Sequence, residues 1–252
     1  MSRLINPKVV ILCAGDASRW GDYLGVPKQL VTFNGESLLH RTERLLRKKG
    51  CHDITVISHD DRLRLETCSF FRPERFQCTT ETFLSTRSLW GEMTLVLLGD
   101  VFYTQNAIER IVSYTNGIHV FGRPGGNLFT GSPYGEIFAF SFARDCADEM
   151  LENAERVCVD AKEGGRGKIW ELYRSLAGFS LAESRTEREI FVSIHDFTDD
   201  VDSPEEYERV AGRYSRLTSG TSLGKLSLYS FLYLTAPCFL FRKCIRRLKR
   251  QF

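Results

Sequence analysis

The sequence lacks the side-chain spacings that hold structural metals. Its eight cysteines contain no Cys-x-x-Cys pair, and its five histidines are scattered, so a zinc knuckle is not expected. The first residues also lack the charged-then-apolar pattern of a secretory leader. We therefore expect free thiols in a reducing compartment. The expected location is the cytoplasm, with peripheral contact at the inner face of a membrane as an alternative.

Internal repeats and low-complexity linkers are also absent before about residue 217. The 252 residues, of which 42% are hydrophobic and 26% charged, have the composition of an ordinary globular protein with a sizeable core. The net charge of +2 is unevenly divided, because residues 242–252 hold six basic and no acidic side chains. Without those six, 28 basic residues stand against 32 acidic ones, so the basic character belongs to the tail. We expect no nucleic-acid partner.

A continuous apolar run over residues 8–13 predicts a strand buried on both faces of a parallel sheet. Similar runs predict further strands over residues 53–58, 94–100, 118–122, 136–142 and 190–194. Apolar residues at helical spacing predict helices over residues 37–46, 105–114, 144–159 and 168–176. This alternation indicates an α/β fold with a Rossmann-like mixed, mainly parallel sheet flanked by helices. Ligands of such sheets bind at the carboxyl ends of the strands.

A turn of small residues, Ala14-Gly15-Asp16, follows the first strand, and two cations, Arg19 and Lys28, come after it. The backbone N–H groups of such a turn can face phosphate oxygens. The two cations would then neutralise charge on a departing pyrophosphate. The alternative is an ordinary turn beside solvated surface charges.

Residues 12–21 (LCAGDASRWG) and 27–30 (PKQL) resemble the signature of the nucleotidyltransferase superfamily. Its members include sugar-1-phosphate nucleotidyltransferases, several alcohol-phosphate cytidylyltransferases and the molybdenum cofactor guanylyltransferases. The resemblance implies a GT-A-type NTP transferase fold. It also implies a reaction in which an acceptor phosphate attacks the α-phosphorus of an NTP and pyrophosphate leaves.

The resemblance assigns roles to the residues of this turn. Ala14, Gly15 and Asp16 would bind the nucleotide, and Arg19 and Lys28 would bind it too and serve as the catalytic cations. Asp16 departs from the pattern, because the family generally has a small or neutral residue there. An anion beside phosphates is unfavourable unless it faces a metal or solvent.

The resemblance also implies a Mg²⁺ site. Gly99-Asp100 after an apolar strand matches the family's metal aspartate, and residues 199–207 resemble the element that supplies the second ligand. Asp202 is the preferred second ligand and Asp200 the reserve. Carboxylates suit a hard cation of this kind. The alternatives are a cap on the next helix for Asp100, and for residues 199–207 a solvated turn with a capping serine before a helix at Ser203-Pro204-Glu205.

Further residues are candidates for binding the nucleotide base and the acceptor. Ser85 lies in a segment that resembles the family's base-contacting region, with a helix cap as the alternative. Arg123 and Lys168 are candidates for the acceptor phosphate and Glu136 for an acceptor hydroxyl or amine, against ordinary loop structure. We expect CTP or UTP rather than GTP or ATP, and a sugar-1-phosphate or an alcohol phosphate such as phosphocholine or inositol phosphate as the acceptor.

The C-terminal tail differs from the rest of the chain. We expect a nucleotidyltransferase domain over residues 1–217, and a hinge with a hydrophobic and basic helical tail over residues 218–252. The apolar stretch 226–241 would reach about 24 Å as a helix, short of a hydrocarbon core of roughly 30 Å. Residues 223–252 therefore predict an interfacial membrane anchor, or a helix that docks on this chain or on a second copy.

Two other functions stay open. One is a GT-A glycosyltransferase, for which Asp200-Val201-Asp202 would be the metal triplet. The other is a catalytically lapsed, nucleotide-binding regulator tethered to a membrane by its tail.

Overall fold

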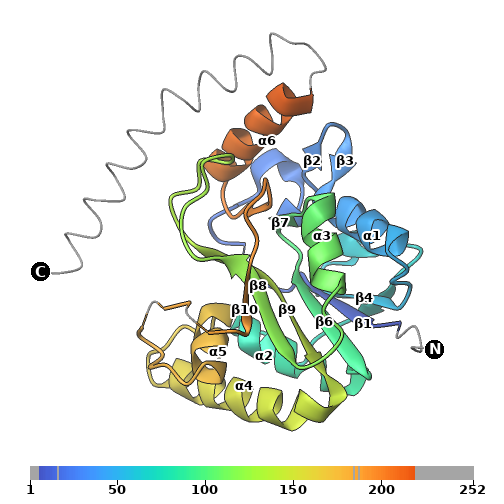
Figure 1. The fold of residues 1–252 in the computed structure, drawn as a ribbon. Coiled ribbons are helices and arrows are strands. Elements are labelled where there is room, and N and C mark those ends of the chain that lie inside the picture. The colour runs from blue at the N-terminus through green and yellow to red at the C-terminus, as the bar shows by residue number, and fades with distance from the viewer. Residues whose placement is uncertain (1–5, 16, 184, 187, 219–252) are drawn as a thin grey trace, which may run out of the picture.

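A single seven-stranded sheet forms the centre of the computed structural model, which describes residues 6–15, 17–183, 185, 186 and 188–218 (Figure 1). The strand order is β10-β8-β9-β6-β1-β4-β5. Only β9 runs antiparallel to its neighbours among these described strands. The predicted mixed, mainly parallel Rossmann-like sheet is confirmed. The strands are β1 (Lys8–Leu12), β4 (Ile54–Ile57), β5 (Ser69–Phe71), β6 (Met93–Leu98), β8 (Ile118–Arg123), β9 (Glu136–Ala143) and β10 (Phe191–Ser193).

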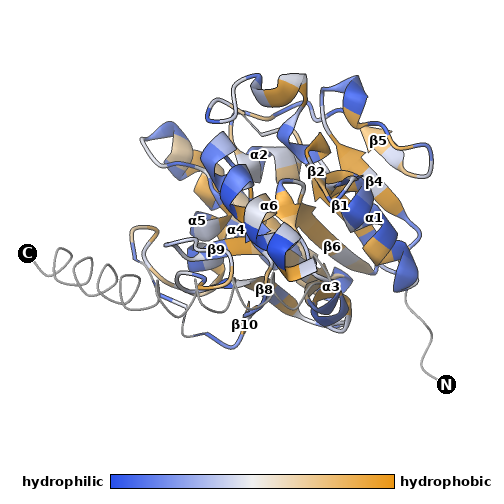
Figure 2. Ribbon diagram, turned by 90° about the horizontal axis from the view of Figure 1, so that it is seen from above, coloured by the Kyte–Doolittle hydropathy of each residue, from blue (hydrophilic) through white to orange (hydrophobic). Residues whose placement is uncertain are grey.

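Helices cover both faces of the sheet (Figure 1). One layer holds α1 (Leu38–Lys48) and α3 (Gln105–Val112), and the other holds α2 (Thr79–Leu84), α4 (Ala147–Lys162) and α5 (Ile169–Leu176). Side chains of a strand alternate between its faces, so Val9 and Ile11 of β1 pack under the first layer and Val10 and Leu12 under the second. Figure 2 shows the apolar strands enclosed between helices with polar outer faces.

Helix boundaries follow from capping residues. Ser37 caps α1, with its Oγ accepting from the His40 N–H at 3.3 Å. The last helix, α6 (Pro204–Thr218), begins with Pro204 as predicted. Its cap is reciprocal, because the Glu206 N–H donates to Ser203 Oγ and Glu206 Oε2 accepts from the Ser203 N–H. The helix expected over 144–159 is a short 3-10 helix followed by α4, which extends to Lys162.

Two small sheets lie beyond the carboxyl end of β6. β7 (Val101–Phe102) pairs antiparallel with β11 (Asp199–Asp200), and β2 (Thr32–Phe33) pairs with β3 (Glu36–Ser37). They join α6 and the β1–α1 connection through a third apolar cluster. The short 3-10 helices are η1 (Tyr23–Gly25), η2 (Lys28–Leu30), η3 (Asp61–Leu63), η4 (Arg87–Leu89) and η5 (Arg144–Cys146).

The described chain ends with α6 at Thr218. The tail expected over residues 218–252 therefore lies, apart from Thr218, outside the described residues, and the boundary after residue 217 stays a prediction. Across the part of the chain that the structure describes, no helix has both the length and the apolar character needed to cross a membrane.

The first strand and β6 approach each other closely where both end, at Gly99. A Cβ at Gly99 would lie 2.3 Å from Cys13 Sγ and 3.0 Å from the Leu12 carbonyl oxygen. We predict that Gly99→Ala lowers the free energy of unfolding by about 1–3 kcal/mol, because buried backbone and sulfur atoms would have to move. Urea denaturation of the purified protein measures this change.

Gly15→Ala is the matched control, since a Cβ at Gly15 would meet no described atom within 4 Å. Equal stability of the two variants would show that the contact at Gly99 is not restrictive.

Candidate active site

The candidate site lies at the carboxyl edge of the two central strands. β1 and β6 are parallel neighbours with Leu12 opposite Leu98, and the Gly99 N–H donates to the Leu12 carbonyl at 2.9 Å. The segments that follow these strands therefore start side by side, one with Ala14-Gly15 and the other with Asp100. Parallel α/β sheets bind their ligands at this edge.

The Ala14-Gly15 turn leaves backbone donors available. Among the described residues, the N–H groups of Ala14 and Gly15 have no hydrogen-bond acceptor, and Gly15 is exposed. Unpaired amides at the end of a buried strand are suited to an anionic ligand. Asp16, the third residue predicted to bind the nucleotide, lies outside the described residues.

The ammonium of Lys28 lies between two carboxylates. Its Nζ is 2.6 Å from Asp100 Oδ2 and 2.5 Å from Asp202 Oδ1, and only 7% of its side chain is exposed. Burial alone would lower the pKa of Lys28, but the two carboxylates outweigh that effect and raise it. Arg19, whose side chain is largely exposed, forms a second ion pair with Asp202. The structure thus brings together four residues predicted from widely separated segments.

Trp20 holds the loop that carries the two cations. Its side chain is buried, its Nε1 donates to the Val26 carbonyl at 2.8 Å, and its ring meets the ring of Tyr207 from α6 edge-on. The loop between Arg19 and Lys28 is therefore fixed against α6. Sequence reasoning assigned no role to Trp20, although large apolar side chains inside a conspicuous loop usually anchor it.

The acidic segment over residues 199–207 is positioned by the small sheet of β7 and β11. Asp200 pairs with Val101, and the Val201 N–H donates to the Asp100 carbonyl at 2.9 Å. This pairing places Asp100 beside residues about a hundred positions later in the chain. Lys28 contacts one carboxylate from each of these two segments.

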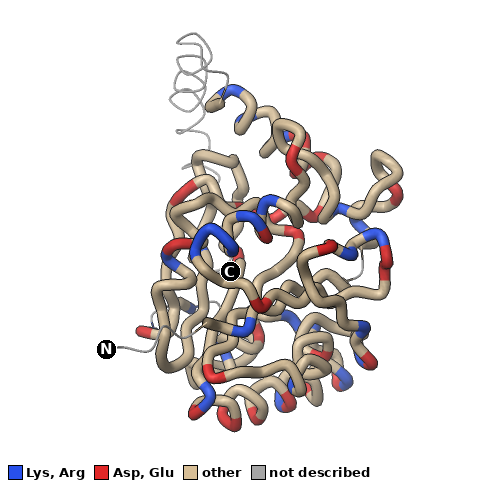
Figure 3. Tube along the Cα trace, turned by 90° about the vertical axis from the view of Figure 1, so that its right-hand side faces the viewer, with Lys and Arg blue, Asp and Glu red and all other residues tan. Residues whose placement is uncertain are grey.

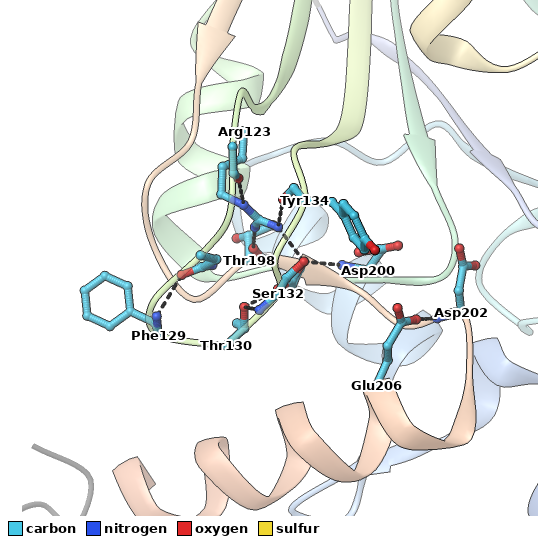
Figure 4. Close-up of polar contacts among 12 residues, drawn as sticks. Arg123, Phe129, Thr130, Ser132, Tyr134, Thr198, Asp200, Asp202 and Glu206 are labelled. Atoms are coloured by element: carbon cyan, nitrogen blue, oxygen red, sulfur yellow. Dashed lines mark hydrogen bonds and ion pairs between the residues drawn. The ribbon is translucent and has the colours of Figure 1, made fainter. Parts of the chain in front are cut away.

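Three carboxylates, from Asp200, Asp202 and Glu206, present oxygens that lie within 4.8 Å of one another (Figure 4). This oxygen-only donor set fits a hard divalent cation such as Mg²⁺. Glu206 was not predicted as a site residue. Its spacing from Ser203 is that of a capping box, and its Oε2 accepts from the backbone N–H groups of Asp202 and Ser203 at 2.9 and 3.2 Å. The cap therefore also orients the acidic segment.

Negative charge exceeds positive charge in this region. Burial, together with Asp199, Asp202 and Glu206, raises the pKa of Glu136 to about 8 against the opposing effect of Arg123. Burial, together with Glu136, Asp199, Asp202 and Asp100, raises the pKa of Asp200 as well. Asp202 behaves differently, because the attraction of Lys28 outweighs its burial and lowers its pKa. A cation added on the Asp200 side would favour the charged forms of these carboxyls and so lower their pKa values.

Arg123 is buried and ties the β8–β9 loop to β11. Its guanidinium donates to Asp199 Oδ1 at 2.9 Å, and to the carbonyls of Gly125, Tyr134 and Thr198 at 2.8, 3.2 and 3.1 Å (Figure 4). Asp199 also accepts a hydrogen bond from the Thr130 hydroxyl. The role in acceptor binding expected for Arg123 stays a prediction, and the contacts show that it orders the loop leading to Glu136.

Ser85 and Lys168 lie elsewhere in the fold. Ser85 is the C-cap of α2, where its Oγ donates to backbone carbonyls and accepts from the Arg75 N–H, and it lines an open groove of about 550 Å³ between α2 and α4. Lys168 directly precedes α5 and is exposed. Among the described residues, neither side chain forms a hydrogen bond or ion pair with Lys28, Asp100 or Asp202. Their predicted contacts with base and acceptor stay predictions.

The buried Arg123–Asp199 pair generates a stability prediction. Arg123→Met would leave the Asp199 carboxylate buried without its cation, so we expect a loss of about 3–5 kcal/mol in the free energy of unfolding. The double variant Arg123→Met/Asp199→Asn should lose less than the sum of the two single changes. Urea denaturation of all four proteins gives the coupling energy.

Arg62→Met is the control, because Arg62 pairs with Asp60 on the surface, and little change is expected there. Additive effects at Arg123 and Asp199 would show that the buried pair does not act as a unit.

Comparisons with known proteins agree with this geometry. The family model of the MobA-like NTP transferase domain matches residues 9–192. The sequence matches none of the curated proteins.

Among solved structures, a UDP-glucose pyrophosphorylase complexed with UDP-glucose is similar, with a TM-score of 0.61 and 12% identity over 84% of this chain and 100% of that one. The inositol-1-phosphate CTP transferase from T. maritima has a TM-score of 0.57 and 14% identity over 85% and 97% of the two chains. The CTP:phosphocholine cytidylyltransferase from Streptococcus pneumoniae has a TM-score of 0.56 and 14% identity over 82% and 98%. At such identities these likenesses show the fold.

The family match covers most of the main sheet, the Ala14-Gly15 turn, Lys28 and Asp100, and it ends before the acidic segment that carries Asp200, Asp202 and Glu206. The predicted superfamily is thereby confirmed: the chain belongs to the MobA-like NTP transferase domain family and is a nucleotidyltransferase.

Proposed function

We propose that this nucleotidyltransferase moves a nucleoside monophosphate from an NTP to a phosphorylated sugar or alcohol, with Mg²⁺ as cofactor and pyrophosphate as the second product. The observation that carries the proposal is the Lys28 ammonium, held between Asp100 and Asp202 at the edge where the Ala14-Gly15 turn offers free amides. A phosphate chain bound by the turn would lie beside a buried cation and a group of carboxylates.

Asp100 and Asp202, with Asp200 and Glu206 nearby, are the residues that would hold Mg²⁺. When bound, the ion would supply positive charge to the phosphates of the nucleotide. The Lys28 ammonium lies between two of these carboxylates, and this arrangement supports a site at which they share a positive charge.

The cations of this chain act on the departing pyrophosphate. In the reaction, an acceptor phosphate oxygen forms a bond to the α-phosphorus, and the bond from that phosphorus to the pyrophosphate oxygen breaks. Arg19 is largely exposed and can turn toward the β- and γ-phosphates, and Lys28 can exchange a carboxylate partner for a phosphate oxygen. Both would stabilise the negative charge that accumulates as pyrophosphate leaves.

The acceptor would enter beside the β8–β9 loop. Glu136 begins β9 next to the acidic segment, and Arg123 fixes the loop that precedes it. A phosphorylated sugar or alcohol fits this polar surface. We propose CTP or UTP as the nucleotide, which the cytidylyl- and uridylyl-type structures of similar fold support. Membrane contact through residues 223–252 stays a prediction.

The activity is tested with the full chain, Mg²⁺, each of the four NTPs, and a panel of sugar-1-phosphates, phosphocholine and inositol phosphate. We expect pyrophosphate release with CTP or UTP and one of these acceptors. Nucleotide binding without turnover across the panel would favour the regulator, and transfer of sugar from a nucleotide sugar would favour the glycosyltransferase. Either result would overturn the proposal.

The role of Lys28 predicts a loss of rate. Lys28→Met should lower kcat by about 100-fold or more, because one preorganised cation facing the leaving group would be missing. Lys48→Met is the matched control, since Lys48 is hydrogen-bonded to Gln105 on the surface. Steady-state pyrophosphate release, with circular dichroism to check folding, measures both variants, and equal rates would contradict the assignment.

Metal binding makes a second prediction with a readout independent of activity. Mg²⁺ should raise the Tm of the wild-type chain, and should raise it further in Lys28→Met, because the ammonium no longer competes for Asp100 and Asp202. Asp202→Asn should reduce the shift, whereas Asp53→Asn, at a surface ion pair with Lys8, should not. The same Mg²⁺ shift in all four proteins would argue against these ligands.

A further inference from the structure

Two large apolar side chains are exposed at the tip of the β8–β9 loop. Leu128 is 42% exposed and Phe129 46%. The tip is well ordered by hydrogen bonds: the Phe129 N–H donates to Asn127 Oδ1 at 2.9 Å, and the Gly131 N–H donates to the Asn127 carbonyl at 2.8 Å. Asn127 is itself buried and donates to the Asp196 carbonyl at 2.9 Å. The apolar pair is therefore presented by a preformed loop and would lose little conformational entropy on binding.

Arginines from α6 lie against the same tip. Arg213 Nη1 is 2.9 Å from the Leu128 carbonyl oxygen and 3.0 Å from that of Phe129, and Arg209 Nε is 3.1 Å from the Thr130 carbonyl. Burial and the charges of Arg209 and Arg216 lower the pKa of Arg213. Their spacing along α6 puts them on one face of the helix. Figure 3 shows the acidic positions of α6 at its start and the basic ones toward its end.

The tip faces away from the acidic site. In Figure 4, the ring of Phe129 points away from Asp200 and Asp202, although the same loop continues to Tyr134 and then to Glu136. The Phe129 ring is therefore directed away from the carboxylates that we propose hold the metal. Leu128 and Phe129 lie at the tip of the β8–β9 loop, and the same loop ends at Glu136, beside the proposed acceptor position.

We propose that Leu128 and Phe129, with Arg209, Arg213 and Arg216, form a docking surface, the tip surface, for an anionic lipid bilayer. The inference goes beyond the proposed function, since no step of nucleotidyl transfer needs it. Two apolar side chains are far fewer than the 20–30 residues that each side of a typical protein interface contributes. They suffice for a bilayer, where each apolar side chain that enters the interface and each nearby cation adds to binding.

Charge and chain direction both favour lipid. The positive charge of arginine side chains attracts the phosphate headgroups of anionic lipids. The chain leaves α6 at Thr218, on the same helix as the arginines, and continues into a sequence with an apolar stretch over 226–241 and six basic residues over 242–252. The tip surface and residues 226–252 therefore both combine apolar side chains with neighbouring basic ones.

The test is binding of the full chain to vesicles of phosphatidylcholine with and without phosphatidylglycerol, measured by cosedimentation. We expect wild-type binding to the anionic vesicles that weakens at high salt. Leu128→Ser/Phe129→Ser should weaken it by about tenfold or more, because two apolar side chains would no longer enter the interface. Phe76→Ser is the matched control, since Phe76 is 51% exposed and packs on His59, and it should bind like the wild type.

A contact readout separates the tip surface from the rest of the chain. The fluorescence of Phe129→Trp should shift to the blue when anionic vesicles are added, and that of Phe76→Trp should not. Unchanged vesicle binding of Leu128→Ser/Phe129→Ser, or no shift for Phe129→Trp, would overturn the proposal. So would a fall in the molecular mass of Leu128→Ser/Phe129→Ser relative to the wild type in light scattering, which would identify a second copy as the occupant. The vesicle-binding and fluorescence results do not depend on whether the chain releases pyrophosphate with any NTP and acceptor.

Discussion

The site depends on one ammonium group shared by two carboxylates. Lys28 contacts both Asp100 and Asp202 where β7 pairs with β11 and where Trp20 packs the preceding loop against Tyr207 of α6. Each of these supports comes from a different part of the chain. The contact is electrostatic, but its geometry is set by apolar packing around Trp20, Phe102 and Val201. The positions of these charged groups therefore depend on the packing of the apolar side chains beneath them.

The main sheet and the grouping of charged residues at its carboxyl edge could be predicted from the sequence for physical reasons. Strands buried on both faces leave continuous apolar runs, which is why 8–13 and 94–100 were located to within a residue or two of β1 and β6. The cations and acids that follow these strands then share an edge. Arg19, Lys28, Asp100 and Asp202 were therefore predicted together, with the family resemblance supplying the second acidic segment.

The rest could not be predicted because it depends on contacts between distant segments. β7 and β11 are two residues each, too short for a periodic pattern, and their pairing spans about a hundred residues. Arg123 gave no indication in the sequence that it would be buried against Asp199, because a single arginine in a Gly/Pro-rich loop is normally exposed. Glu206 has the spacing of a capping box from Ser203, and only the fold shows that this cap borders a group of carboxylates.

The direction of β9 has a consequence for how this fold can diversify. Because β9 alone among the described strands of the main sheet runs against its neighbours, its first residue lies at the edge where the other strands end. The β8–β9 hairpin thus opens onto the site from both of its strands. A hairpin loop can lengthen or shorten at small entropic cost and without reordering any strand. Under the proposed function, acceptor selectivity can therefore change through insertions in this loop, independently of the turn and the carboxylates that we propose serve the nucleotide.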